Sequence, residues 1–191
     1  MGVVLRKGAN LSLSKAEPGL EKIIVGLGWD ARSTRGQAFD LDASVFMLTT
    51  SGQVRSDLDF IFYNNLKAKD GSVEHLGDNL TGDGDGDDEV IRVDLTKLSA
   101  DITKLVFVVS IHEAAERHQN FGQVANSTIR ILNNATRNEI ARFDLSEEGG
   151  TETEMIFGEV YRYNGEWKFK AIGQGYENGF IELIKSYGVS V

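Results

Sequence analysis

The feature that most constrains the fold of this chain is its division into short segments that alternate between apolar and polar residues or form brief apolar runs. Examples are 22–29, 90–95, 105–111 and 127–132. Alternation with a period of two is typical of a strand buried on one face, whereas a wholly apolar run such as 105–111 is typical of a central strand buried on both faces. Glycine, asparagine and aspartate separate the segments, since the chain has 21 glycines and one proline. About nine or ten such strands with little helix predict a mainly β fold, a two-sheet β-sandwich.

The last third of the chain predicts a hairpin followed by a helix. The dipeptide at 164–165, Asn-Gly, favours a tight turn between strands at 155–163 and 167–171. The odd-numbered positions of this hairpin are expected to share one face: Met155, Phe157, Tyr161, Tyr163, Trp167 and Phe169. After Tyr176 the apolar period changes to that of a short amphipathic helix, with Phe180, Leu183, Ile184 and Tyr187 on one side. Nearer the N-terminus, 3–13 is predicted as an edge strand and 59–65 as a short strand.

The stretch 77–89, with the sequence GDNLTGDGDGDDE, carries six acidic residues and no basic one. A solvated acidic loop is the ordinary interpretation of such a run. The alternation of glycine and aspartate at 83–87 favours a cation site instead, because a loop that wraps an ion needs backbone able to turn its carbonyl groups inward. The spacing excludes an EF-hand, which needs glycine at the sixth position and glutamate at the twelfth, where Asp88 and Asp94 stand. A repeated β-roll is excluded too, because there is one copy.

Further acidic residues stand at the predicted ends of strands. Asp40 and Asp42 occupy alternate positions and share a face, about 7 Å apart along the strand. Asp30 and Asp59 also lie where a strand ends or begins. Because a sandwich gathers its loops at two ends, these residues and the acidic stretch could meet at one of them.

Composition excludes several classes of function. The absence of cysteine excludes disulfides, thiol catalysis and Cys-ligated zinc, and a net charge of -9 argues against nucleic-acid binding by a basic face. No apolar run approaches the roughly 18 residues that span a bilayer, and the first ten residues do not resemble a signal peptide. The three histidines lack zinc-like spacing and are interpreted as ordinary hydrogen-bonding residues. No catalytic constellation is evident, and 1–191 is predicted to form a single domain.

Six motifs occur in a fixed order along the chain: VGLGWD at 25–30, FDLDAS at 39–44, DFIFYNN at 59–65, the acidic stretch at 77–89, VSIH at 109–112 and GEWKFKAIGQGY at 165–176. Together they resemble the TerD family of tellurite-resistance and general stress proteins. The resemblance covers essentially the whole chain and keeps the motif order, without distinguishing one paralogue from another.

The resemblance implies a calcium-binding β-sandwich that holds two Ca²⁺ ions and has no enzymatic activity. The ligands it implies are Asp40, Asp42, Asp59, Asp78, Asn79, Gly82, Asp83, Asp85, Gly86, Asp87, Asp88 and Glu89. It further implies a bacterial cytoplasmic protein that contributes to resistance to tellurite, phage and colicins. Its partners would be other products of the same gene cluster, including a membrane protein that could hold it at the inner membrane.

The favoured interpretation is a calcium-ordered interaction module, in which bound ions order the loops and the ordered surface recruits partner proteins. Two alternatives remain open from the sequence. A C2-like module would dock on anionic lipid through Ca²⁺, and would need basic and apolar residues at its loop tips. A Ca²⁺- or Mg²⁺-dependent hydrolase would use a spare acid or His112 as a general base. No substrate-positioning residues support the hydrolase, so it is the less favoured of the two.

Overall fold

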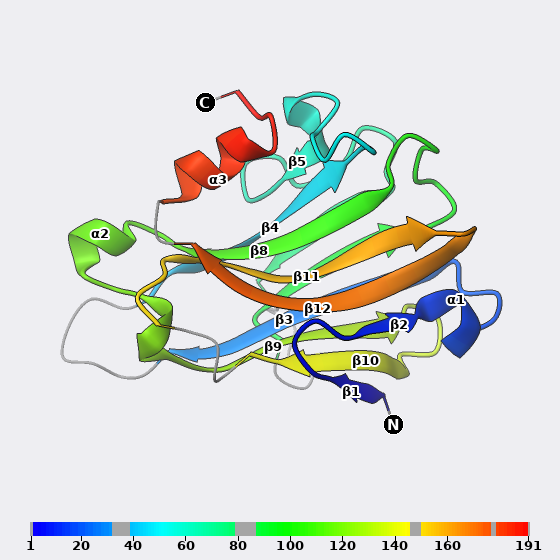
Figure 1. Ribbon diagram of the computed structural model, residues 1–191, viewed down its shortest axis with the longest axis horizontal. Helices are drawn as coiled ribbons and strands as arrows, with labels where there is room; N and C mark the ends of the chain where they lie inside the picture. Colours follow the sequence, from blue (N-terminus) through cyan, green and yellow to red (C-terminus); the bar gives the residue numbers. More distant parts are fainter. Residues whose placement is uncertain (1, 32–38, 79–86, 146–149, 177–178, 191) are drawn as a thin grey trace.

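Two six-stranded sheets face each other in the computed structural model, which describes residues 2–31, 39–78, 87–145, 150–176 and 179–190 (Figure 1). The first sheet has the strand order β1-β10-β9-β3-β7-β6 and the second β2-β12-β11-β8-β4-β5. The predicted mainly β fold of two sheets is therefore confirmed. The strands of the first sheet are β1 (Val3–Leu5), β3 (Lys22–Ala31), β6 (Val73–Asp78), β7 (Glu89–Asp94), β9 (Val124–Asn133) and β10 (Glu139–Asp144). Those of the second are β2 (Asn10–Ser12), β4 (Leu41–Leu48), β5 (Phe60–Ile61), β8 (Lys104–Ile111), β11 (Glu154–Tyr163) and β12 (Glu166–Tyr176).

The strand β8 is buried on both faces, as its apolar run predicts. Leu105, Phe107 and Val109 belong to the main core between the sheets, while Val106 and Val108 belong to a second cluster on the outer face. Helix α3 (Phe180–Ser186) covers that outer face and completes a third layer (Figure 1). The apolar side predicted for this helix is confirmed, since all four residues assigned to it pack in the second cluster: Phe180, Leu183, Ile184 and Tyr187. The remaining short helices are α1 (Leu13–Ala16), α2 (Ala114–Arg117), η1 (Asp57–Asp59) and η2 (Phe121–Gln123).

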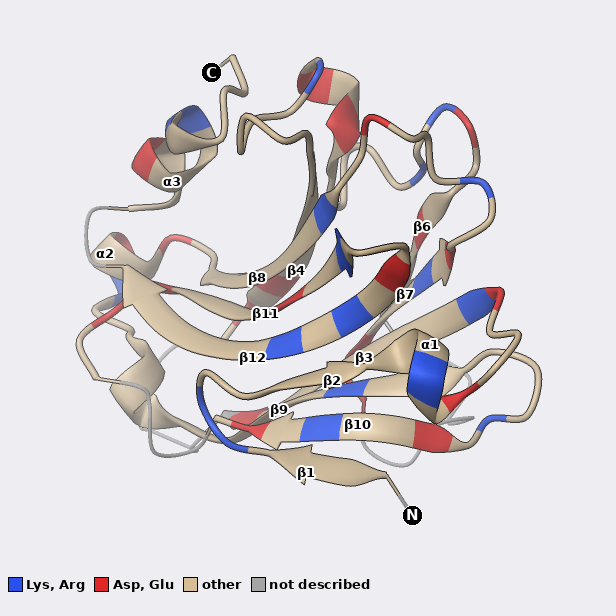
Figure 2. Ribbon diagram, turned by 45° about the vertical axis from the view of Figure 1, so that its right-hand side comes forward, with Lys and Arg blue, Asp and Glu red and all other residues tan. Residues whose placement is uncertain are grey.

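The outward faces of the strands carry the charge. In β12, Lys168 and Lys170 alternate with the buried Phe169 and Ala171, so the basic residues form bands along the outside of the strand (Figure 2). The hairpin that joins β11 to β12 turns at Asn164 and Gly165, both with positive φ, 50° and 76°, as the predicted tight turn requires.

The prediction for the shared face of this hairpin is confirmed for Met155, Phe157, Trp167 and Phe169, which pack on the main core, and is wrong for the second half of β11. A β-bulge between Ile156 and Gly158 shifts the register of β11 against both of its neighbours. Beyond the bulge, Val160 replaces Tyr161 in the core, and Tyr163 is exposed. A bulge inserts one extra residue and so exchanges the two faces of the strand after it.

Two other segments differ from their predicted form. The segment 3–13 is not one edge strand but two, because β1 pairs in parallel with β10 in the first sheet while β2 pairs with β12 in the second. The segment 59–65 contributes only the two-residue strand β5, followed by a tight turn in which Phe62 and Asn65 form a bridge. Both differences arise from tertiary pairing, which residue patterns in one short segment do not specify.

Candidate metal centre

The first part of β4 is held by two side chains from the opposite sheet. The short strand β5 pairs with β4 only at Val45 and Phe46. Nearer the start of β4, the Ala43 N–H donates to Glu89 Oε2 at 2.6 Å, and the Ala43 carbonyl lies 3.1 Å from His75 Nε2. Glu89 begins β7 and His75 belongs to β6, and each is only 5% exposed. These two side chains therefore join the two sheets at one end of the sandwich.

The histidine also contacts the glutamate directly. His75 Nε2 lies 3.2 Å from Glu89 Oε2, and the Gly77 N–H donates to His75 Nδ1 at 3.0 Å. The neutral ring consequently carries its proton on Nε2, where both acceptors are. Burial alone lowers the pKa of His75, but the hydrogen bond and charge of Glu89 outweigh it and raise the pKa above its ordinary value.

The last three residues of the acidic stretch make contacts in three directions. Asp87 binds the guanidinium of Arg130 in β9, with Nε 2.8 Å from Oδ1 and Nη2 2.9 Å from Oδ2. Asp88 accepts the Trp29 N–H of β3 at 2.7 Å, and Glu89 accepts the Ala43 N–H of β4. Three consecutive carboxylates are thus fixed to three different strands.

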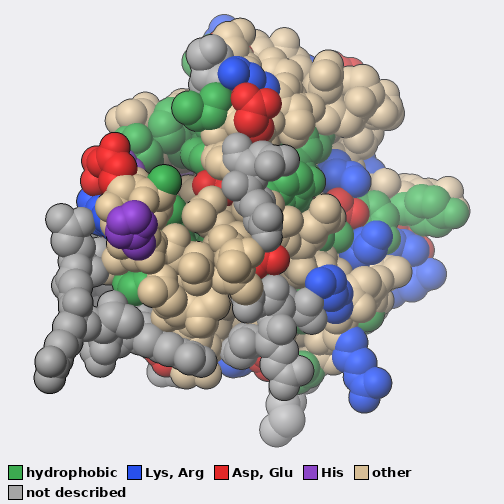
Figure 3. Space-filling view, turned by 60° about the vertical axis from the view of Figure 1, so that its left-hand side comes forward, with side chains coloured by type: hydrophobic (Ala, Val, Ile, Leu, Met, Phe, Trp, Pro, Cys, Tyr) green, Lys and Arg blue, Asp and Glu red, His purple; other side chains and the backbone are tan. Residues whose placement is uncertain are grey.

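A hollow of about 320 Å³ lies where these elements meet, lined by Trp29, Phe39, Asp40, Leu41, Asp87, Asp88 and Glu89. Figure 3 views the molecule with this end brought forward and shows acidic side chains exposed on it. Asp40 is exposed just before β4, and its carbonyl accepts the His112 N–H at 2.8 Å. Carboxylates from two sheets therefore surround one open space.

Mutual repulsion among these carboxylates is visible in two of them. The pKa of Asp42 is raised by burial and then by the charges of Asp40 and Glu89. The pKa of Asp88 is also raised, by burial and by neighbouring acids, although the hydrogen bond from Trp29 opposes the change. Each carboxylate makes the ionised form of the next less favourable, and a bound cation would relieve that repulsion.

The structure brings together only part of the ligand set that the resemblance implies. Asp40, Asp42, Asp87, Asp88 and Glu89 lie at this end of the sandwich. The backbone of Asp78 lies in β6, paired with Glu89. The other implied ligands of the acidic stretch lie outside the described residues: Asn79, Gly82, Asp83, Asp85 and Gly86. Within the part of the chain that the structure describes, no three acidic or histidine side chains converge closely enough to hold an ion by themselves.

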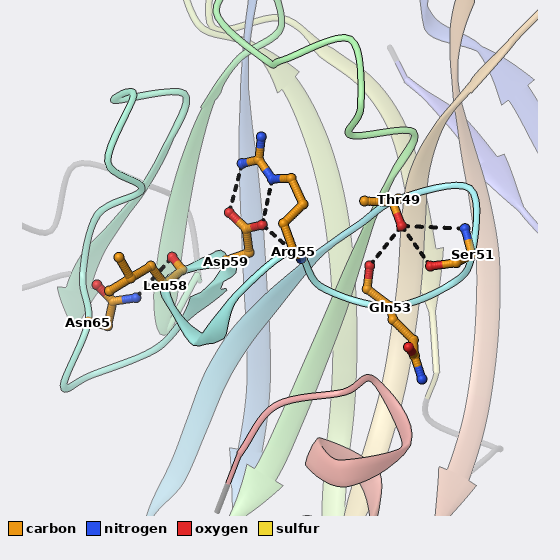
Figure 4. Close-up of polar contacts among 7 residues, drawn as sticks. All are labelled: Thr49, Ser51, Gln53, Arg55, Leu58, Asp59 and Asn65. Atoms are coloured by element: carbon orange, nitrogen blue, oxygen red, sulfur yellow. Dashed lines mark hydrogen bonds and ion pairs between the residues drawn. The ribbon is translucent and has the colours of Figure 1, made fainter.

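Asp59 is not brought to the hollow. It ends η1, beside the strand β5 that pairs with the middle of β4, and its carboxylate accepts from the Arg55 guanidinium at 2.7 and 2.8 Å and from the Arg55 backbone N–H at 3.1 Å (Figure 4). Asp30, the acid at the end of β3, accepts the side-chain amide of Asn126 at 2.6 Å. Each of these two carboxylates is thus hydrogen-bonded to a neighbouring side chain.

Sequence reasoning missed the residues that hold the acidic stretch in place. The alternation over 127–132 places Arg130 on a solvent-facing side of a strand, but nothing in the sequence pairs it with an acid 43 residues earlier. His75 does act as a hydrogen-bonding residue, as predicted, yet its position between the sheets follows only from the fold.

Comparison with known proteins identifies close relatives of this chain. The family model described as the TerD domain matches residues 1–187. The chain is 56% identical over 190 residues to the tellurium resistance protein TerD of Serratia marcescens, covering 100% of this chain and 99% of the relative. It is 51% identical to general stress protein 16U of Bacillus subtilis, with full coverage of both. A crystal structure of a TerD homologue from Streptomyces coelicolor has the same fold, with a TM-score of 0.68 and 22% identity over 86% of this chain and 95% of that one.

Proposed function

This chain belongs to the TerD family, and from that premise we propose that it is a stress-response protein that contributes to tellurium resistance as a calcium-ordered interaction module. The curated relatives carry names for resistance and general stress, and none of those quoted above names a reaction. The proposed role is therefore binding rather than catalysis. The proposed location is the cytoplasm, with other proteins of the same resistance cluster as partners, among them a membrane protein that would bring the chain to the inner membrane. No helix among the described residues is long and apolar enough to cross a bilayer.

The observation that carries the calcium proposal is the crowding of carboxylates at one hollow. Asp40, Asp88 and Glu89 line it with carboxylate oxygens, and Asp42 lies close enough to Asp40 and Glu89 for their charges to add to burial in raising its pKa; the pKa of Asp88 is raised by burial and by neighbouring acids too. Oxygen ligands in sets of about six to eight suit Ca²⁺. We propose that these four residues supply part of the shell for two ions. The residues that would complete it are Asp78, Asn79, Gly82, Asp83, Asp85 and Gly86.

Calorimetric titration of metal-stripped protein with Ca²⁺, with Mg²⁺ as competitor, tests this proposal. We expect two sites of micromolar or tighter affinity, because the acids are crowded before the ion arrives. At a Ca²⁺ concentration of 100 times Kd, each site should stabilise the fold by about 2.7 kcal/mol and raise Tm by about 5–10 °C. Asp42→Asn and Asp88→Asn should weaken binding about tenfold or more, whereas Asp101→Asn, an exposed acid before β8, should not. No heat and no change in Tm in the wild type would overturn the proposal.

One observation supports the lipid-docking alternative as a second candidate. Two large apolar side chains near this end of the sandwich are exposed: Leu76 is 42% exposed and lies in β6 two residues before Asp78, which pairs with Glu89, and Leu66 is 48% exposed. The Asn65 amide donates to the carbonyls of Leu58 and Phe60, at 3.3 and 2.7 Å, which fixes the turn that precedes Leu66 (Figure 4). The backbone N–H of His75, next to Leu76, donates to the Leu66 carbonyl.

Sedimentation with phosphatidylglycerol vesicles separates the two candidates. Lipid docking requires binding only when Ca²⁺ is present, and its loss in Leu66→Ser/Leu76→Ser. Val4→Ser, at an apolar residue of β1 that is 65% exposed, is the matched control. If wild-type protein loaded with Ca²⁺ stays in solution, lipid docking is excluded and the interaction module remains.

A further inference from the structure

The carboxylate of Asp87 is built into the outer face of the first sheet. It lies over Gly26 of β3, where a Cβ atom would overlap both carboxylate oxygens. Gly26 stands directly opposite Arg130 in the pairing of β3 with β9, so the guanidinium reaches the carboxylate from the neighbouring strand. The glycine supplies the space and the arginine supplies the charge.

The geometry of this pair leaves Asp87 unsuited to hold a metal ion. Both of its oxygens accept from Arg130, in the two-pronged arrangement that fits guanidinium to carboxylate. The Asp87 side chain is only 6% exposed, and Glu139 lies 3.8 Å from Arg130 Nη1. A cation placed at Asp87 would have to displace a positive charge from a nearly dry site.

The residues after Asp87 depend on where it is fixed. The Asp88 N–H donates to the Leu27 carbonyl at 2.8 Å, one position along β3 from Gly26. From there the Asp88 carboxylate turns to Trp29 and the Glu89 carboxylate turns inward to Ala43. Fixing Asp87 on the outer face therefore sets the direction of the next two acids, Asp88 and Glu89, which also line the hollow.

We propose that Arg130 and the space at Gly26 form an anchor that fixes the end of the acidic stretch through Asp87, and that this anchor sets the calcium affinity of the hollow. Arg130 and Asp87 are positioning residues in this scheme, and neither touches the ion. The inference rests on the calcium site proposed above, and it removes Asp87 from the ligand set that the family resemblance implies.

Calcium affinity in Arg130→Met is the decisive measurement, because anchoring and simple electrostatics predict opposite signs. Removing a positive charge near a cation site should strengthen binding if charge alone matters. Loss of the anchor should instead weaken binding by about tenfold, within the range expected for coupling between contacting residues. Arg142→Met is the matched control, because Arg142 stands opposite Arg130 on β10 and pairs with the exposed Asp144. It removes the same charge without touching the anchor, and its affinity should be unchanged or slightly higher.

Two further variants separate anchoring from a general loss of structure. Gly26→Ala keeps every charge and displaces the Asp87 carboxylate, so it should also weaken binding. Asp87→Asn should weaken binding in the wild type but add little once Arg130 is Met, because both changes remove the same contact. Near-UV circular dichroism of the metal-free variants checks that the core remains packed.

The outcomes distinguish this inference from the calcium proposal itself. If wild-type protein binds Ca²⁺ and both Arg130→Met and Gly26→Ala bind as tightly, the anchor is refuted and the site stands. If Asp87→Asn costs as much in the Arg130→Met background as in the wild type, Asp87 is a ligand and the anchor is also refuted. If the wild type does not bind, the calcium proposal has failed.

Discussion

Replacing Glu89 by alanine tests the connection between the two sheets, and it can be measured without any metal. In Glu89→Ala the Ala43 N–H loses its acceptor, and His75 Nε2 loses Glu89 but keeps its contact with the Ala43 carbonyl. Ala43 is 1% exposed, so water cannot readily replace the carboxylate. A hydrogen bond to a charged group contributes about 1.5–3 kcal/mol, and an unsatisfied buried N–H costs a similar amount. These two figures describe the same loss and are not added.

Two smaller effects modify that value in opposite directions. The lost methylene group removes about 0.8 kcal/mol of apolar burial. Relief of repulsion with Asp42 and Asp88 returns about 0.5–1 kcal/mol, since both are partly solvated. The net expectation is a loss of about 1.5–3 kcal/mol in the free energy of unfolding, which lowers Tm by about 3–12 °C for a chain of this length.

Urea denaturation in the presence of a chelator measures this loss. Glu74→Ala is the control, because Glu74 lies beside His75 in β6 and pairs with Lys67 and Arg92 at the surface. Its effect should stay within about 0.5 kcal/mol. Glu89→Gln keeps an acceptor oxygen and should lose about half as much as Glu89→Ala. If Glu89→Ala and Glu74→Ala unfold at the same urea concentration, the proposed connection does not stabilise the fold.

Three other substitutions have expected outcomes that follow from single contacts. Asp59→Ala should lose about 1–2 kcal/mol in chemical denaturation, because it removes the acceptor of an Arg55 guanidinium that water can partly replace, yet keep wild-type calcium affinity; a weakened affinity would return Asp59 to the ligand set. Asp94 has a lowered pKa, because the hydrogen bonds from Thr96 and the charge of Lys22 outweigh burial. Its contribution is present at neutral pH and lost as pH falls through the folded value, so Asp94→Asn should reduce the urea midpoint at pH 7 but not at pH 2. Burial raises the pKa of Glu154, so its ionisation costs stability at neutral pH; Glu154→Gln should raise the urea midpoint at pH 7 and leave it unchanged near pH 4, and equal midpoints at pH 7 would contradict this.

The sequence predicts those parts of the fold that depend on one strand at a time. The alternation over 90–95 and 127–132 and the apolar run at 105–111 give strands whose buried faces the structure confirms, because burial on a sheet follows the two-residue period. The bulge between Ile156 and Gly158 breaks that period, and its one signal is the glycine inside the strand, so the face of Tyr161 is mispredicted. Strand pairing across the chain, such as β1 with β10, is likewise absent from local pattern.

The candidate site divides along the same line. Alternation and turn positions could predict that acidic residues gather at the ends of strands. Which acids face the hollow could not be predicted, because it depends on contacts such as those of Asp87 with Arg130 and of Asp59 with Arg55. Those contacts separate carboxylates held by an arginine from carboxylates crowded against one another.

The split of the N-terminal segment between the two sheets has a consequence for synthesis of the protein. β1 and β2 precede every other described strand in the chain, yet their partners, β10 and β12, end at Asp144 and Tyr176. A ribosome must therefore complete most of the chain before either strand can find its place. Until then the two segments, including the apolar Val3 and Val4, remain open to chaperones and to other nascent chains. The outermost strands on one side of the sandwich are made first and paired last.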